Sequence, residues 1–234
     1  MQTDRADPMN KADIRNAASV ILLRQIGGAP AVLMGQRGSG AAFMPDKFVF
    51  PGGALDAADF KVSLAEPLPD RCMARLRRDA DPALAEPLAL AAIREVWEET
   101  GLLIGRPDPG AAALAREAPE DWRSYFNAGA RPSGAGMRFV FRAITPPGRP
   151  RRFDARFFTV DAGAIIGDAD DFSRASDELR HLQWIPLSRA RSFDLPFITE
   201  VVLAEVEASL KEPGRDASVP YFYNEEGRSH FLRL

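Results

Sequence analysis

The segment 88–100 restricts the fold of this chain more than any other part of its sequence. Pro87 precedes the segment and Gly101 follows it, which is the pattern of a helix that begins after a proline and ends at a glycine. One side of this predicted helix is mostly apolar and can pack into a core. The residues on that side are Ala89, Ile93, Val96, Trp97 and Thr100.

The other side of the predicted helix carries three carboxylates. At about 100° per residue, Glu98 and Glu99 fall within about 60° of Glu95, and Arg94 lies beside them. Like charges at this spacing repel one another and destabilise an isolated helix. A divalent cation such as Mg²⁺ or Mn²⁺, which prefers oxygen ligands, would relieve that repulsion. A solvated acidic face is the alternative interpretation.

Composition excludes several classes of protein. The 234 residues are 46% hydrophobic and 27% charged, as in soluble globular proteins, and the net charge of −3 argues against a nucleic-acid partner. The longest apolar run, 17–23, is too short to cross a membrane. Cys72 is the only cysteine and no secretion signal is visible, so we expect a reducing compartment, the cytoplasm.

Strand and helix patterns alternate irregularly along the chain, which predicts an α+β or mixed α/β fold. Residues 1–14 read as a mobile polar leader, and 15–234 as a single domain. The expected strands are 17–25, 31–37, 47–50, 137–144, 155–160 and 181–185. The expected helices besides 88–100 are about 70–78, 120–126 and 195–211.

The residues from Arg94 to Leu102, R-E-V-W-E-E-T-G-L, resemble the second half of the Nudix box, G-x5-E-x7-R-E-U-x-E-E-x-G-U, where U is aliphatic. Gly53 matches the leading glycine within a typical F-P-G-G context. The spacing differs, because 32 residues (54–85) separate Gly53 from Glu86, 27 more than in the box. Glu86 matches the glutamate of E-x7-R-E. Asp59 is an acid at the position of the glutamate in G-x5-E, so either residue is a candidate for the first acid.

The resemblance implies a Nudix-type α/β/α sandwich with a mixed sheet. Members of this superfamily hydrolyse nucleoside diphosphates linked to another moiety and use divalent cations, here Mg²⁺ or Mn²⁺. Glu95 would bind metal or act as the base, with Arg94 orienting it. The metal ligands implied by position are Glu95, Glu98, Glu99 and a backbone carbonyl of Gly52 or Gly53.

Two further site residues lie outside the box. Glu178 precedes a strand with a W-x-P sequence, where many Nudix enzymes carry another acid, and Asp177 is the second candidate; a surface acid is the alternative. Arg37, upstream of F-P-G-G, resembles part of the signature of coenzyme A diphosphatases, which makes Arg37 and Gly52 candidates for substrate binding. Coenzyme A or its acyl esters are the first expected substrates, and ADP-ribose or dinucleotides the second.

The insertion 54–85 starts and ends beside the proposed metal site, so we expect it to lie over or beside the cleft. A surface decoration or a dimer contact is the alternative. Residues 221–223 suit an added strand or a contact in a homodimer. The competing function is a Nudix-fold module that binds a nucleotide without cleaving it, although such modules commonly lose the box carboxylates.

Overall fold

A long β-hairpin forms the centre of the main sheet. In the computed structural model, which describes residues 13–41, 43–212 and 218–234, the two strands are β1 (Ile14–Ile26) and β2 (Ala29–Arg37). Gly27 and Gly28 connect them with φ angles of 57° and 81°, a left-handed conformation that glycine adopts without steric cost. β1 begins inside the segment expected to be a leader, and residues 1–12 lie outside the described residues.

The main sheet is mixed, as expected. Its strand order is β10-β2-β1-β8-β7-β11-β12, with β3 paired to β2 and β4 paired to β1. β1 pairs with β8 in parallel, as does β7 with β11, while the other pairs are antiparallel. The remaining strands of this sheet are β3 (Phe48–Val49), β4 (Gly52–Ala54), β7 (Arg138–Ile144), β8 (Arg152–Asp161), β10 (Leu179–Pro186), β11 (Pro220–Glu225) and β12 (Arg228–Arg233).

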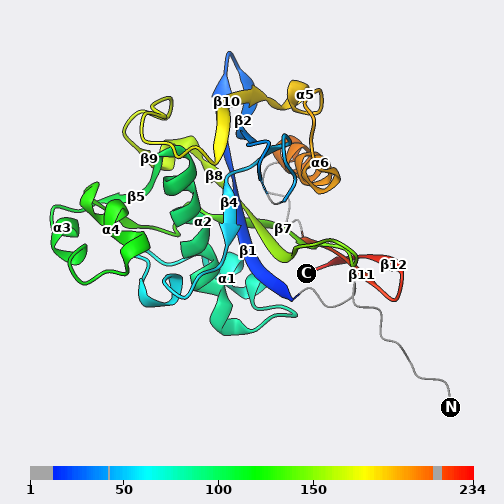
Figure 1. The fold of residues 1–234 in the computed structure, drawn as a ribbon, viewed down its shortest axis with the longest axis horizontal. Helices are drawn as coiled ribbons and strands as arrows, with labels where there is room; N and C mark the ends of the chain where they lie inside the picture. Colours follow the sequence, from blue (N-terminus) through cyan, green and yellow to red (C-terminus); the bar gives the residue numbers. More distant parts are fainter. Residues whose placement is uncertain (1–12, 42, 213–217) are drawn as a thin grey trace.

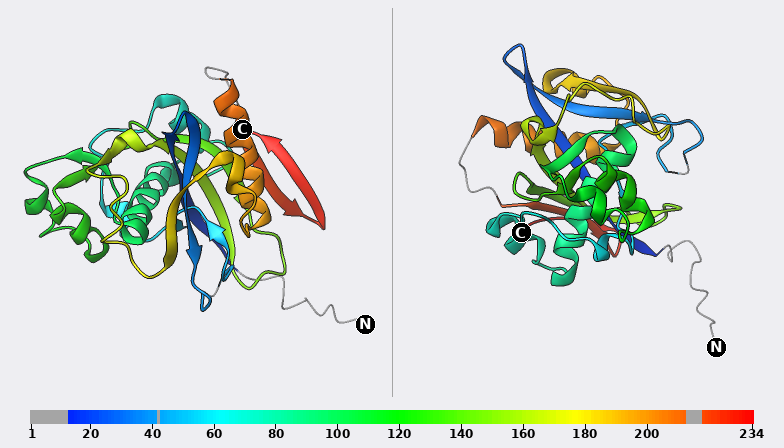
Figure 2. Two further views of the ribbon diagram at one scale, coloured as in Figure 1. Left: turned by 90° about the horizontal axis from the view of Figure 1, so that it is seen from above. Right: turned by 90° about the vertical axis from the view of Figure 1, so that its left-hand side faces the viewer.

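Helices cover both faces of this sheet (Figure 1). The helix α2 (Ala85–Thr100) packs on one face against β1, and α6 (Phe197–Lys211) covers the other face (Figure 2). Each helix has its own apolar core beneath it, which confirms the α/β/α arrangement. The shorter helices are α1 (Asp70–Leu76), α3 (Ala111–Leu114), α4 (Glu120–Asn127) and α5 (Leu187–Ala190), with 3-10 turns η2 (Asp59–Lys61), η3 (Pro82–Leu84) and η4 (Ala162–Ala164).

Most of the predicted elements are present, within a few residues of the expected bounds. The exceptions are short strands that sequence patterns did not indicate, among them a second sheet of order β6-β5-β9 beside the end of α2. Its strands are β5 (Leu103–Pro107), β6 (Ala130–Pro132) and β9 (Ile165–Ile166). Residues 221–223 form part of strand β11, next to the edge strand β12, and the homodimer stays a prediction. None of the described helices has the length and apolar character needed to cross a membrane.

Candidate active site

The acidic side of α2 faces the short strand β4. The helix ends at Gly101, whose φ of 73° and N–H bond to the carbonyl of Trp97 close the last turn. Near that end, the backbone N–H of Gly52 donates to Glu99 Oε2 over 2.7 Å. Glu99 is almost fully buried, 2% exposed. The F-P-G-G turn and the helix are therefore joined at a carboxylate, as the sequence predicts.

Gly53 lies directly against Glu95. A Cβ atom at this position would lie 2.4 Å from Glu95 Cδ and 2.5 Å from both carboxylate oxygens. Such distances are shorter than a van der Waals contact, so a side chain at residue 53 would push the carboxylate away. Glycine is needed here because of this close approach.

Arg94 connects most of the acidic residues. Its guanidinium donates through Nη1 to Glu95 Oε1 over 2.8 Å and to Glu98 Oε2 over 3.2 Å. On its other edge, Nε and Nη2 donate to the two oxygens of Asp59 over 2.9 and 3.0 Å, and Nη2 also reaches the carbonyl of Ala54. The arginine is 5% exposed and Asp59 is fully buried. One planar cation therefore fixes three carboxylates, as the fork geometry of arginine allows.

The electrostatics of the cluster favour protonated glutamates while no cation is bound. Burial, together with the charge of Glu98, raises the pKa of Glu95 to about 7 against the opposing effect of Arg94. Burial raises the pKa of Glu99 strongly, and the neighbouring charges of Glu95 and Glu178 raise it further. The pKa of Glu98 is raised for the same reason, burial first. Positive charge placed nearby would lower these pKa values and so favour the ionised carboxylates.

The residues present suit a hard divalent cation. Glu99 Oε1 is buried and accepts no hydrogen bond in the described part of the chain, so this oxygen is available as a cation ligand. Within the same residues, no three His, Cys, Asp or Glu side chains converge closely enough to enclose a metal ion. Mg²⁺ sites commonly keep several waters and use one or two carboxylates plus substrate phosphates, so an open set of oxygens fits.

Comparisons with known proteins agree with this site. No protein-family model matches the chain. The "Putative nudix hydrolase 7" of Caenorhabditis elegans is 26% identical over 178 residues, covering 73% of this chain and 51% of that protein. The "Acyl-coenzyme A diphosphatase NUDT19" of Gallus gallus is 34% identical over 135 residues, covering 42% of this chain and 35% of that protein. A crystal structure of a NUDIX hydrolase from Alicyclobacillus acidocaldarius superposes with a TM-score of 0.60 at 28% identity, covering 86% of this chain and 96% of that chain.

The chain resembles Nudix hydrolases in both its sequence and its fold. It spans about half the length of the nematode relative and about a third of the chicken one. The likeness to the bacterial structure extends over 86% of this chain.

Of the two candidates for the first acid, Asp59 is the one that contacts Arg94. It forms the two-fold ion pair with Arg94, whereas Glu86 accepts a hydrogen bond from the backbone N–H of Leu64, 3.1 Å away. With Asp59 as the first acid, the box keeps its normal spacing from Gly53, and the additional residues lie between Asp59 and Arg94. With Glu86 as the first acid, they lie at 54–85.

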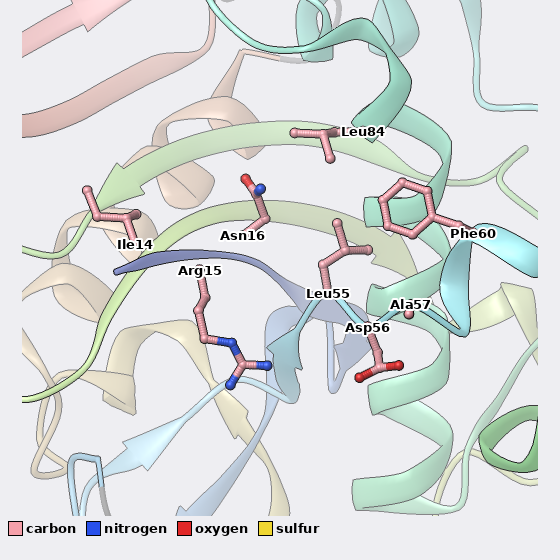
Figure 3. Close-up of a pocket in the computed structure, with 8 residues that line it drawn as sticks. All are labelled: Ile14, Arg15, Asn16, Leu55, Asp56, Ala57, Phe60 and Leu84. Carbon is pink, nitrogen blue, oxygen red and sulfur yellow. The ribbon is translucent and has the colours of Figure 1, made fainter. Parts of the chain in front are cut away.

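The inserted segment lies mainly at the N-terminal end of α2, away from the carboxylates near its C-terminal end (Figure 1). Leu68, Cys72 and Leu76 from this segment are buried in the core that α2 shares. Part of the segment is thus built into the core, and its position over or beside the cleft stays a prediction. Residues 55–60, Leu84 and the beginning of β1 line a hollow of about 530 Å³. In this hollow, Phe60 and Leu84 lie on the opposite side from Arg15 and Asp56 (Figure 3).

Glu178 and Arg37 lie at the edge of the Nudix site and contact each other. Arg37 Nη2 donates to Glu178 Oε1 over 3.0 Å across 141 residues of sequence. The Arg37 charge counteracts the raised pKa of Glu99, so both side chains lie near the buried end of the carboxylate cluster. Glu178 is exposed, with its side chain 54% accessible, and precedes β10 as predicted.

The loop that carries Glu178 is attached to the rest of the molecule at several points. The N–H of Ser176 donates to the carbonyl of Glu98, and the indole of Trp184 donates to the carbonyl of Ala169. Arg24 adds an ion pair with Asp170 and lies 4.3 Å over the Trp184 ring. The sequence analysis did not predict these contacts. It did single out the W-x-P sequence, whose Trp184 makes one of them.

Proposed function

We propose that this chain is a divalent-cation-dependent hydrolase that cleaves the pyrophosphate bond of a nucleoside diphosphate linked to another moiety. The supporting observation is the excess of carboxylates around a single arginine. The charge of Arg94 is balanced by that of Asp59. Three further carboxylates lie in the same cluster and have raised pKa values: Glu95, Glu98 and Glu99. A cation and the diphosphate of a substrate together would balance this charge.

In the proposed reaction the oxygen of a water molecule attacks one phosphorus and the bond from that phosphorus to the bridging oxygen breaks. Two phosphate monoesters result. A bound Mg²⁺ or Mn²⁺ would neutralise the diphosphate and make the water more acidic, with Glu95, Glu98, Glu99 and a carbonyl of Gly52 or Gly53 as its proposed ligands.

Glu95 is the proposed acceptor of the proton from the water. This role is the alternative to binding the cation directly, and the pKa of about 7 in the cation-free cluster suits a general base. Arg94 holds Oε1, so the proton would pass to Oε2 and then to solvent. Glu178 is a second candidate for a ligand or base, and Arg37 beside it is placed to contact a phosphate of the substrate.

Coenzyme A or an acyl ester of it is the proposed substrate. Support comes from the partial coenzyme A diphosphatase signature between Arg37 and Gly53, and from the name of the chicken relative. Cleavage would give adenosine 3′,5′-bisphosphate and a 4′-phosphopantetheine, acylated where the substrate was. ADP-ribose and dinucleotides are the second choice.

The test is a product analysis by chromatography with coenzyme A, acyl-CoA, ADP-ribose, NADH and diadenosine polyphosphates, each with Mg²⁺, Mn²⁺ or EDTA. We expect cation-dependent cleavage of a coenzyme A compound and loss of cleavage in Glu99→Gln. If the protein bound one of these compounds stoichiometrically but left it intact with either cation, the binding module without hydrolysis would be the correct function.

A further inference from the structure

A tryptophan outside the Nudix box contacts the acid that holds Arg94. Trp122 lies in α4, is fully buried, and donates from Nε1 to Asp59 Oδ1 over 3.1 Å. The same oxygen accepts the hydrogen bond from Arg94 Nε. No motif in the sequence around Trp122 indicates a role at the site.

The carboxylate of Asp59 is surrounded by donors. Oδ1 accepts from Trp122 and Arg94, while Oδ2 accepts from the other edge of Arg94 and from the backbone N–H of Asp56 over 2.9 Å. Each oxygen thus has two donors, and the side chain has one orientation that satisfies all of them. Because this carboxylate is fully buried, a lost donor cannot be replaced readily by solvent.

The position of the indole is itself fixed by α4. The Trp122 ring packs edge-on against Tyr125 at 5.3 Å, and the Tyr125 hydroxyl donates to the carbonyl of Ile104. A second indole joins α4 to α2, since Trp97 Nε1 on α2 donates to Ser124 Oγ on α4 over 2.9 Å. The Trp122 N–H therefore points at Asp59 from a helix, α4, that is itself held against α2 and β5.

We propose that Trp122 is a positioning residue for the cation site. It holds Asp59, Asp59 orients the guanidinium of Arg94, and Arg94 in turn places Glu95 and Glu98. The inference rests on the proposed function, because those glutamates are taken to be cation ligands. Groups that orient ligands commonly change metal affinity by about 10–100-fold when removed.

The experiment compares Trp122→Phe with Trp97→Phe. Both changes keep an aromatic ring and remove one indole N–H donor. The first removes the donor to Asp59, and the second removes the donor from α2 to Ser124 on α4. Binding of Mn²⁺ alone is measured by the electron paramagnetic resonance of the free ion, and thermal unfolding is recorded in parallel. We expect affinity for Mn²⁺ to fall about 10-fold in Trp122→Phe and less than about 2-fold in Trp97→Phe, at similar losses of thermal stability.

Equal Mn²⁺ affinity in Trp122→Phe and the unaltered protein, or an equal loss in Trp97→Phe, would overturn the inference. If Trp122→Phe folds poorly, benzothienylalanine at position 122 keeps the two-ring shape and lacks the N–H, and the same comparison applies. A protein that binds Mn²⁺ and loses it as described, yet cleaves no substrate, would refute the proposed function and leave the positioning role standing. An unaltered protein that binds no Mn²⁺ would overturn both.

Discussion

Replacing Gly53 by alanine is expected to separate the catalytic requirement at this turn from the structural one. The added Cβ would lie 2.4 Å from Glu95 Cδ, and ordinary van der Waals contact begins at about 3.4 Å, so the carboxylate has to move by about 1 Å. The atoms that must move are the end of a flexible side chain. The fold can therefore accommodate the methyl group while the site cannot.

The magnitudes follow from that displacement. Misplacing a reacting group by about 1 Å costs about 10²-fold in rate. The Arg94–Glu95 hydrogen bond would be weakened, a loss of about 1–2 kcal/mol, and alanine returns part of this by restricting the unfolded chain. For a chain of this length the melting temperature should fall by no more than roughly 4 °C.

The neighbouring substitution Gly52→Ala should behave in the opposite way. Its Cβ would meet backbone atoms of β1, 2.4 Å from the carbonyl oxygen of Ala18 and 2.6 Å from Ser19 Cα, and those atoms cannot turn aside. Strand β4 would have to separate from β1, which we expect to cost about 3 kcal/mol, or roughly 10 °C in melting temperature.

The assay combines thermal unfolding with kcat/KM for the best substrate of the panel, at fixed Mg²⁺. Gly136→Ala is the matched control, because its Cβ would lie in ordinary contact, 3.7 Å from Ala164 Cβ. A Gly53→Ala protein with wild-type kcat/KM, or one destabilised as much as Gly52→Ala, would refute the reasoning.

Three further predictions concern the carboxylates and their arginine. Glu98→Gln and Glu99→Gln should each lower turnover by about 10²–10⁴-fold without loss of folding, as checked by kinetics at saturating Mg²⁺ and Mn²⁺. The pKa of Glu95 is raised by burial from 4.5 to about 7, so the folded state holds this proton more tightly, and the metal-free protein should lose up to about 3 kcal/mol as pH rises from 4.5 to 7. Unfolding in urea with EDTA should show this loss, and Glu95→Gln should make it smaller by the share of Glu95, leaving the losses from Glu98 and Glu99, whose pKa values are also raised. Arg94→Lys should lower both activity and melting temperature, since one ammonium cannot replace five hydrogen bonds in a buried position, and retention of both would contradict the role.

Local patterns predicted the part of the site that lies within one element. The helical period placed Glu95, Glu98 and Glu99 on one side of α2, and Gly101 marked its end, because a helix repeats its geometry at every turn. The F-P-G-G turn was also recognised from the sequence. Nearby residues of this kind need no information about the rest of the chain.

The fold class followed from the same kind of pattern. Alternating apolar stretches indicated most strands of the mixed sheet, and the packing of α2 and α6 on its two faces agrees with the expected layers. The short strands of the second sheet were not indicated, because two or three residues carry too little periodicity to be recognised. The roles of the site residues and the single domain stay predictions.

Only the tertiary structure decided which acid pairs with Arg94. Asp59 and Glu86 both satisfied a spacing rule, and the choice depends on how 34 intervening residues fold between Asp59 and the arginine. Two other contacts also depend on the tertiary structure. Trp122 contacts Asp59, 63 residues away, and Glu178 contacts Arg37, 141 residues away. The sequence by itself determined the helix, its acidic face and the glycine turn, since those depend on neighbouring residues. The partners of that face come from distant segments that are brought together by burial of the core, and no local pattern contains this information.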